Sequence, residues 1–103
     1  MRKRRRYPSR AEALQERYGI TVEQYDAMLL AQKGKCAICF KPETVKRRGK
    51  LRRLAVDHCA ETGQVRGLLC GRCNLAIGGM DHDVDRMQRA IHYITRPPAK
   101  KIL

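Results

Sequence analysis

The chain has 103 residues, of which 5% are aromatic, so it can form one domain with a modest hydrophobic core. Its formal net charge of +13 favours a polyanionic partner, either a nucleic acid or an acidic membrane surface. No apolar run is long enough to span a bilayer, and no apolar segment follows the basic N-terminus, which argues against a membrane span and a secretory signal. So thin a core favours stabilisation by a structural metal ion.

Two short helices are predicted behind a basic run that extends from Arg2 to Arg6. Ser9 and Glu12 have the spacing of a capping box, which predicts a first helix from about Arg10 to Tyr18. Gly19 is suited to end this helix as a C-cap. The capping pattern then recurs, and it predicts a second helix whose apolar side chains share one face: Val22, Tyr25, Met28 and Leu29.

The segment 41–53 is polar and is predicted to form an exposed loop or hairpin tip. It holds seven basic residues: Lys41, Lys46, Arg47, Arg48, Lys50, Arg52 and Arg53. Alternation of residue types after it predicts a strand from Leu54 to His58. Glu61-Thr62-Gly63 is a turn signal, and Val65 to Leu69 is predicted to be the returning strand.

Two further helices are predicted in the last third of the chain. The first carries Cys73 and Asn74 and stops at Gly78-Gly79. The second begins among three aspartates, which suit a helix N-terminus because the helix dipole favours anions there: Asp81, Asp83 and Asp85. Its apolar stripe consists of Val84, Met87, Ala90, Ile91 and Ile94, and Pro97-Pro98 ends it.

Four of the five cysteines form two C-x2-C pairs that are separated by 30 residues: Cys36 with Cys39, and Cys70 with Cys73. An odd count argues against a closed disulfide framework, and in a reducing compartment such pairs are metal ligands, which places the protein in the cytoplasm. Four thiolates match a tetrahedral structural Zn²⁺ with no open position for substrate. The alternatives are a redox dithiol or an iron–sulfur site, and Cys59 is interpreted as a small buried or half-buried thiol.

Asp57, His58 and Asn74 lie beside these pairs and have the chemistry of phosphodiester hydrolysis. A carboxylate and an amide oxygen suit Mg²⁺ or Mn²⁺, and an imidazole can deprotonate water near neutral pH. Adjacent strand residues point to opposite faces. Asp57 and His58 can therefore share a site only if the strand ends or bends there.

The run from Leu54 to Asn74, together with Cys36-Ala37-Ile38-Cys39, resembles the recombination endonuclease VII family, phage members of the HNH (His-Me finger) superfamily. The resemblance covers about residues 20–80. It implies an α+β fold, a small zinc-stapled ββα-metal domain with flanking helices. It also implies that Asp57 and Asn74 hold a catalytic Mg²⁺ or Mn²⁺, that His58 is the general base, and that the substrate is duplex, nicked or branched DNA.

The same resemblance implies a phage protein that acts in the cytoplasm of its host, as a monomer or a homodimer. We predict three parts: a basic arm and short helix over residues 1–18, a zinc-bound HNH endonuclease domain over 19–96, and a tail over 97–103. The candidate DNA contacts are Arg66, Arg72, Lys46, Arg47, Arg48, Lys50, Arg52 and Arg53.

Two alternatives to an active nuclease remain open. A non-enzymatic zinc-ribbon module that binds nucleic acid would explain the charge and the cysteines, but not Asp57, His58 and Asn74. A nuclease that has lost activity is the other, because Cys59-Ala60 replaces a second Asp-His pair found in many members of the family. His82 could also approach the phosphate.

Overall fold

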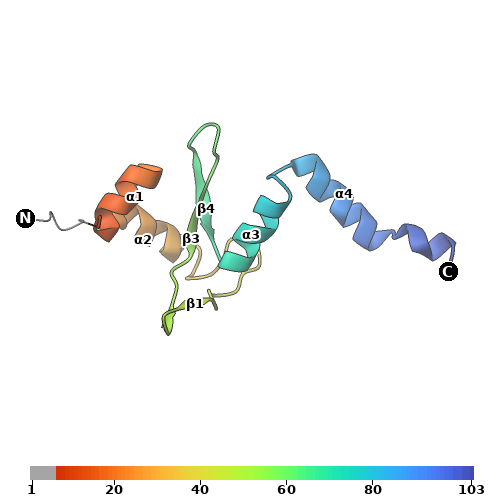
Figure 1. The fold of residues 1–103 in the computed structure, drawn as a ribbon, viewed down its shortest axis with the longest axis horizontal. Helices are drawn as coiled ribbons and strands as arrows, with labels where there is room; N and C mark the ends of the chain where they lie inside the picture. The colour runs from red at the N-terminus through yellow and green to blue at the C-terminus, as the bar shows by residue number, and fades with distance from the viewer. Residues whose placement is uncertain (1–6) are drawn as a thin grey trace, which may run out of the picture.

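A computed structural model describes residues 7–103, so the basic run Arg2–Arg6 lies outside the described residues. The elements follow one another along an elongated molecule of 70 × 33 × 32 Å (Figure 1). They are α1 (Arg10–Tyr18), α2 (Val22–Ala31), β1 (Lys46–Arg47), β2 (Lys50–Leu51), β3 (Ala55–His58), β4 (Val65–Leu69), α3 (Gly71–Gly79), α4 (Val84–Thr95) and the 3-10 helix η1 (Pro98–Lys101). The predicted α+β class is confirmed.

Local side-chain caps explain where α1 and α2 begin. The Ser9 hydroxyl accepts a hydrogen bond from the Glu12 backbone N–H at 3.2 Å. At α2 the capping box is complete, because Thr21 accepts from the Gln24 N–H and Gln24 accepts from the Thr21 N–H, at 3.1 and 2.8 Å. Gly19 ends α1 in the left-handed conformation, with a φ of 68° that favours glycine.

β3 and β4 form an antiparallel pair against which the N-terminal helices pack. The Tyr25 hydroxyl of α2 donates to the Leu54 carbonyl oxygen at 2.6 Å, just before β3. Apolar burial centres on Leu68, which is fully buried. The buried hydrophobic residues are Leu14, Ile20, Tyr25, Cys36, Leu54, Val56, Leu68, Leu69 and Cys70.

A single glutamine joins α2 to β4. The Gln32 side chain accepts from the Leu68 N–H and donates to the Leu68 carbonyl, both at 2.9 Å, and it also donates to the Lys35 carbonyl at 2.9 Å. A Cβ at Gly67 would lie 3.2 Å from Oε1 of the Gln32 side chain, so a side chain at position 67 would crowd this contact. Gln32 thereby holds the segment between α2 and the first cysteine pair against β4.

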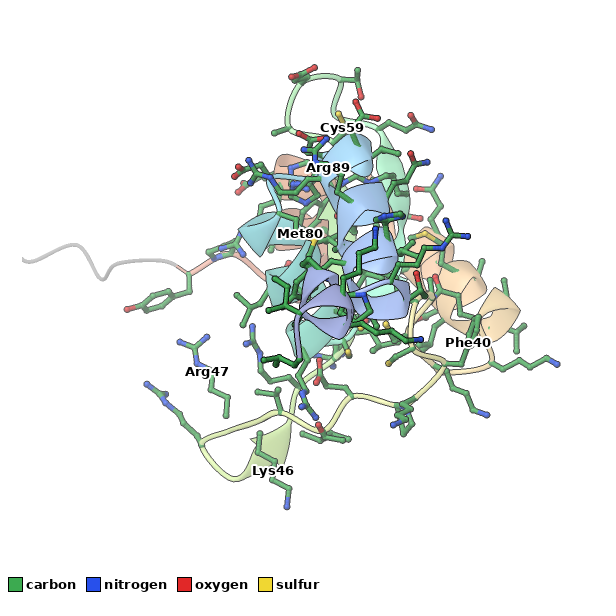
Figure 2. The ribbon with its side chains drawn as sticks, turned by 90° about the vertical axis from the view of Figure 1, so that its right-hand side faces the viewer. Phe40, Lys46, Arg47, Cys59, Met80 and Arg89 are labelled. Atoms are coloured by element: carbon green, nitrogen blue, oxygen red, sulfur yellow. The ribbon has the colours of Figure 1, made fainter. Side chains whose placement is uncertain are left out.

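The basic segment 41–53 forms a hairpin, which is one of the two forms predicted for it. β1 pairs with β2 in antiparallel register, and the turn between them uses positive φ angles of 52° at Arg48 and 76° at Gly49. Lys46 and Arg47 project from it into solvent (Figure 2). The hairpin thus presents its cations away from the core.

α4 extends away from the sheet (Figure 1). Asp83 caps it by accepting from the Arg86 N–H at 3.1 Å, and the helix ends at Thr95, just before Pro97. None of its residues is buried, and the predicted apolar stripe is largely exposed. Among the described residues, no helix is long and apolar enough to cross a membrane.

Candidate metal centres and the polar site beside them

The four paired cysteines converge on one point. The Sγ atoms of Cys36, Cys39, Cys70 and Cys73 all lie within 4.8 Å of one another. The Cys39 and Cys70 sulfurs are 3.8 Å apart, which matches the edge of about 3.8 Å that a tetrahedron with Zn–S bonds of about 2.3 Å requires. The donor set and its geometry therefore fit zinc, and four protein ligands leave no position for substrate.

The protonation of this cluster also favours a divalent cation. Burial disfavours the Cys36 thiolate, but backbone hydrogen bonds from Cys39, Cys70 and Ile38 outweigh burial and lower the pKa of Cys36 to about 6. Burial and the neighbouring sulfurs raise the pKa of Cys73 to about 12. Thiolates packed this closely repel one another, and a bound Zn²⁺ removes that repulsion by binding all four in deprotonated form.

Glu43 supports the second cysteine pair from inside the basic segment. Its carboxylate is only 8% exposed. It accepts backbone hydrogen bonds from Thr44 and Val45 at 3.0 Å and from Gly71, the first residue of α3, at 2.8 Å. Burial alone would raise its pKa, but these N–H groups and the charge of Arg52 lower it. Glu43 thus anchors the start of the helix that carries Cys73.

Glu43→Gln is expected to lower the free energy of unfolding by about 1–3 kcal/mol at neutral pH, because an amide leaves a buried N–H without its acceptor. The folded-state pKa of Glu43 is lowered, so its contribution exists above the unfolded pKa of about 4.3 and is lost as pH falls through the folded pKa. The stability difference between wild type and variant should therefore be full at pH 7 and shrink below about pH 4.3.

Urea unfolding of both zinc-loaded proteins across this pH range measures the difference. The comparison is made at each pH at which both proteins keep their zinc, because zinc loss is expected to unfold the two alike. Glu61→Gln, which changes an exposed glutamate, is the matched control and should be neutral. Equal stability of Glu43→Gln and wild type at pH 7 would contradict the anchoring role.

Asp57 lies at an irregularity in the β3–β4 pair. Asp57 pairs with Gly67, whereas its neighbour His58 pairs with Val65. One residue of β4, Arg66, is therefore extra, which is the pattern of a β-bulge. The bulge lies on β4, opposite the step from Asp57 to His58, so it is the alternation of side chains on β4 that changes beside this pair.

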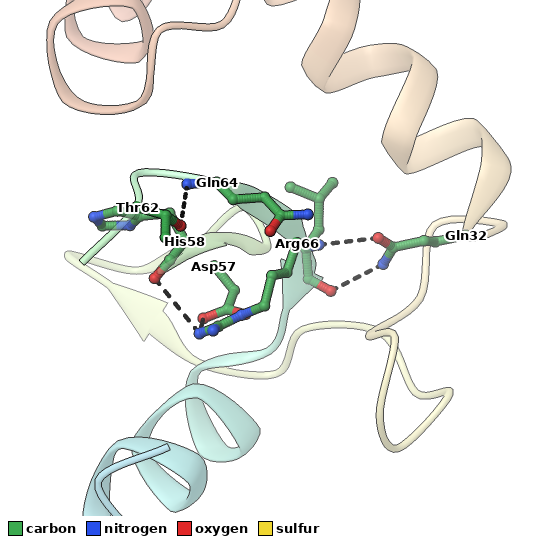
Figure 3. Close-up of polar contacts among 7 residues, drawn as sticks. Gln32, Asp57, His58, Thr62, Gln64 and Arg66 are labelled. Atoms are coloured by element: carbon green, nitrogen blue, oxygen red, sulfur yellow. Dashed lines mark hydrogen bonds and ion pairs between the residues drawn. The ribbon is translucent and has the colours of Figure 1, made fainter. Parts of the chain in front are cut away.

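The Asp57 carboxylate is bound on both oxygens by Arg66 (Figure 3). Arg66 Nε donates to Oδ2 at 2.6 Å and Nη2 donates to Oδ1 at 3.0 Å. The hydrogen bond from Arg66 is the main reason that the pKa of Asp57 is lowered, against the effect of burial, and the charges of Arg66, His82 and His58 lower it further. Asp57 is thus an ionised carboxylate, the form that a hard cation binds.

His58 and Asn74 both follow Asp57 in the sequence, and their settings differ. The His58 side chain is exposed, and its ring packs edge-on against Tyr18 of α1, with ring centroids 5.1 Å apart. Asn74 is half-buried in the first turn of α3, where its N–H donates to the Cys70 carbonyl at 2.9 Å. Because α3 packs against β3, the helix with Asn74 contacts the strand with Asp57 and His58.

The remaining candidates lie at the surface around this centre. Arg72 is exposed in the first turn of α3. His82 is exposed in the α3–α4 turn with a φ of 54°, and its charge acts on Asp57. Cys59 is half-buried, outside the four-sulfur cluster, and a hydrogen bond with the Thr62 side chain lowers its pKa. The hairpin cations, from Lys46 to Arg53, form a separate exposed group.

Sequence reasoning missed Glu43 and Gln32. Both lie in polar surroundings along the chain, and their partners, Gly71 and Leu68, are 28 and 36 residues away. A single acidic residue within the basic segment 41–53 was the available signal for Glu43. The interpretation of this whole segment as exposed was wrong at that residue, because the α3 N-terminus buries it.

Comparison with known proteins adds to this geometry. A family model described as recombination endonuclease VII matches residues 11–96. The Gene 59 protein of Mycobacterium phage D29 is 46% identical over 87 residues, and that of Mycobacterium phage L5 is 41% identical. Each alignment covers 84% of this chain and 50% of the relative, so the chain spans about half the length of these curated relatives. No solved structure matches. On the extent of the family match, the chain belongs to the recombination endonuclease VII family.

Proposed function

We propose that this protein is a metal-dependent endonuclease that hydrolyses phosphodiester bonds in DNA. The observation that carries the proposal is the ionised Asp57, which lies opposite the bulge and directly before His58 on a strand packed against α3, the helix of Asn74. The four-cysteine cluster links the pair Cys36 and Cys39 to the pair at the start of α3, and it would hold this arrangement when it binds zinc. Family membership supports the reaction class.

In this proposal His58 takes the proton from the attacking water. Its exposed ring is free to meet substrate on one side, while the edge-on contact with Tyr18 limits its rotation. Asp57 and Asn74 supply the hard oxygen ligands for Mg²⁺ or Mn²⁺. When bound, the ion would stabilise negative charge on the phosphate and the leaving oxygen. We assign to Arg72, which is exposed at the start of α3, the contact with a neighbouring phosphate.

The DNA surface that we propose combines this site with the exposed basic hairpin. Exposed cations bind phosphates without regard to sequence and release counterions, which gives strong, salt-dependent affinity. The cations that we assign to this surface are Lys46, Arg47, Arg48, Lys50, Arg52 and Arg53. The relatives are phage proteins, and we propose that the site of action is DNA inside the infected bacterium, where thiols stay reduced.

Cleavage of supercoiled plasmid, linear duplex, single strand and a four-way junction, with Mg²⁺ and with EDTA, tests the proposal. We expect nicked or linear product with Mg²⁺ and none with EDTA. A non-enzymatic zinc-ribbon module or an inactive nuclease would bind the same DNA and leave it intact. DNA binding without cleavage in Mg²⁺ or Mn²⁺ would therefore contradict the proposal and favour one of these two alternatives.

A further inference from the structure

Arg66 occupies the face of Asp57 that a metal ion would need. Its guanidinium contacts both carboxylate oxygens, at 2.6 and 3.0 Å. With Arg66 in place the Asp57 side chain is only 8% exposed, whereas Arg66 itself is 39% exposed. Both carboxylate oxygens are therefore already paired, and an ion that binds them has to take the place of the guanidinium.

A small cavity borders the Asp57–Arg66 pair. Asp57 and Arg66 line this cavity of about 170 Å³ with Ile38, Leu69 and Ile77. Its other lining residues are apolar or glycine, so Asp57 and Arg66 are the polar side chains at this cavity. Arg66 comes from the extra residue of the bulge, and its side chain is partly exposed.

We propose that Arg66 is a gating residue for the catalytic metal: it pairs with Asp57 when no ion is bound, and a divalent ion must displace it. A dication and a guanidinium repel each other at short range, so they compete for the same carboxylate. The inference rests on the proposed function, because it takes Asp57 as a metal ligand.

Displacement would couple metal binding to DNA binding. Without the ion, Asp57 and Arg66 neutralise each other, so the pair offers little attraction to a phosphate. With a dication on Asp57, the ion and the released guanidinium together carry an excess of positive charge at the site. The affinity for DNA should therefore rise when metal binds, and reciprocally DNA should tighten the metal. Arg66 would then contact the phosphate only in the loaded protein.

The direct test is Mn²⁺ binding to the zinc-loaded full chain, measured by the electron paramagnetic resonance of free Mn²⁺. Arg66→Met keeps the length of the side chain and removes its competition, and it should bind Mn²⁺ about tenfold more tightly than wild type. Arg86→Met is the matched control, because it also removes one arginine that pairs with an aspartate, Asp81, at 2.8 Å. Its Mn²⁺ affinity should stay within about twofold of wild type, since that pair is exposed.

Asp57→Asn separates failure of this inference from failure of the proposed function. Loss of Mn²⁺ binding in Asp57→Asn, with unchanged or weaker binding in Arg66→Met, would overturn the gating role and leave the metal site intact. Arg66 would then share Asp57 with the ion instead of competing with it. Unchanged Mn²⁺ binding in Asp57→Asn would instead overturn the assignment of Asp57 as a ligand.

A second measurement examines the coupling. Anisotropy of a short labelled duplex at constant ionic strength gives DNA affinity with and without Mn²⁺, in a His58→Ala background that prevents cleavage. The gain in affinity on adding Mn²⁺ should be smaller in Arg66→Met than in the background protein. An equal gain in both would show that the released guanidinium does not reach the DNA.

Discussion

His58→Ala is expected to lower the rate of DNA cleavage by about 100- to 10,000-fold, the usual contribution of a general base. The side chain is exposed and its ring packs against Tyr18 at the surface, so its removal should change neither zinc content nor thermal stability appreciably. DNA affinity should also be unchanged, because His58 binds no phosphate in this mechanism. Single-turnover cleavage of plasmid DNA measures the rate without the effect of product release.

Two variants make this result specific. His92→Ala changes another exposed histidine, on α4, and should cleave at the wild-type rate. Asp57→Ala should differ in kind, because it removes a metal ligand and raises the Mg²⁺ concentration needed for cleavage. If His58→Ala cleaves at nearly the wild-type rate with intact Mg²⁺ dependence, the assigned role is wrong, and His82 becomes the next candidate for the base.

Removal of zinc is expected to unfold the protein. Structural zinc contributes about 10–16 kcal/mol of apparent binding free energy in small four-ligand domains, which exceeds the net stability of most small proteins. Two of the ligands, Cys36 and Cys70, belong to the buried core itself. Cys36→Ser should therefore lose zinc, tertiary structure, DNA affinity and cleavage together.

Elemental analysis and near-ultraviolet circular dichroism measure this loss. Cys59→Ser is the matched control, since its thiol is half-buried and lies outside the cluster; it should keep one zinc per chain and a cooperative unfolding transition. A folded wild-type protein with well under one zinc per chain would contradict the assignment of the cluster as a structural zinc site.

The parts of the fold that the sequence predicts best are those determined by neighbours along the chain. The N-cap at Ser9 and the full capping box at Thr21 are confirmed, because each uses residues three positions apart. The strand Val65–Leu69 is confirmed with its predicted bounds, since a turn and a cysteine pair delimit it. The cysteine cluster follows from ligand chemistry, which ties two distant pairs to one point.

The features that could not be predicted from the sequence depend on strand register and on contacts between distant residues. The pairing of Arg66 with Asp57 requires the bulge that makes Arg66 the extra residue of β4, and a pattern of alternating residues does not reveal a bulge. Glu43 is buried only because α3 begins beside it. The helical periodicity of α4 correctly predicted a helix, but periodicity does not show whether an apolar face finds a partner.

The glutamine that joins α2 to β4 has a consequence for self-association. A two-stranded sheet exposes unpaired backbone groups along its outer strands, and such edges recruit strands from other molecules into aggregates. At Leu68 the edge of β4 is already occupied, because Gln32 pairs with both backbone groups and the Ala37 N–H adds a bond to the same carbonyl at 3.1 Å. The side-chain amide thus imitates a neighbouring strand at the position where an incoming chain would have to dock.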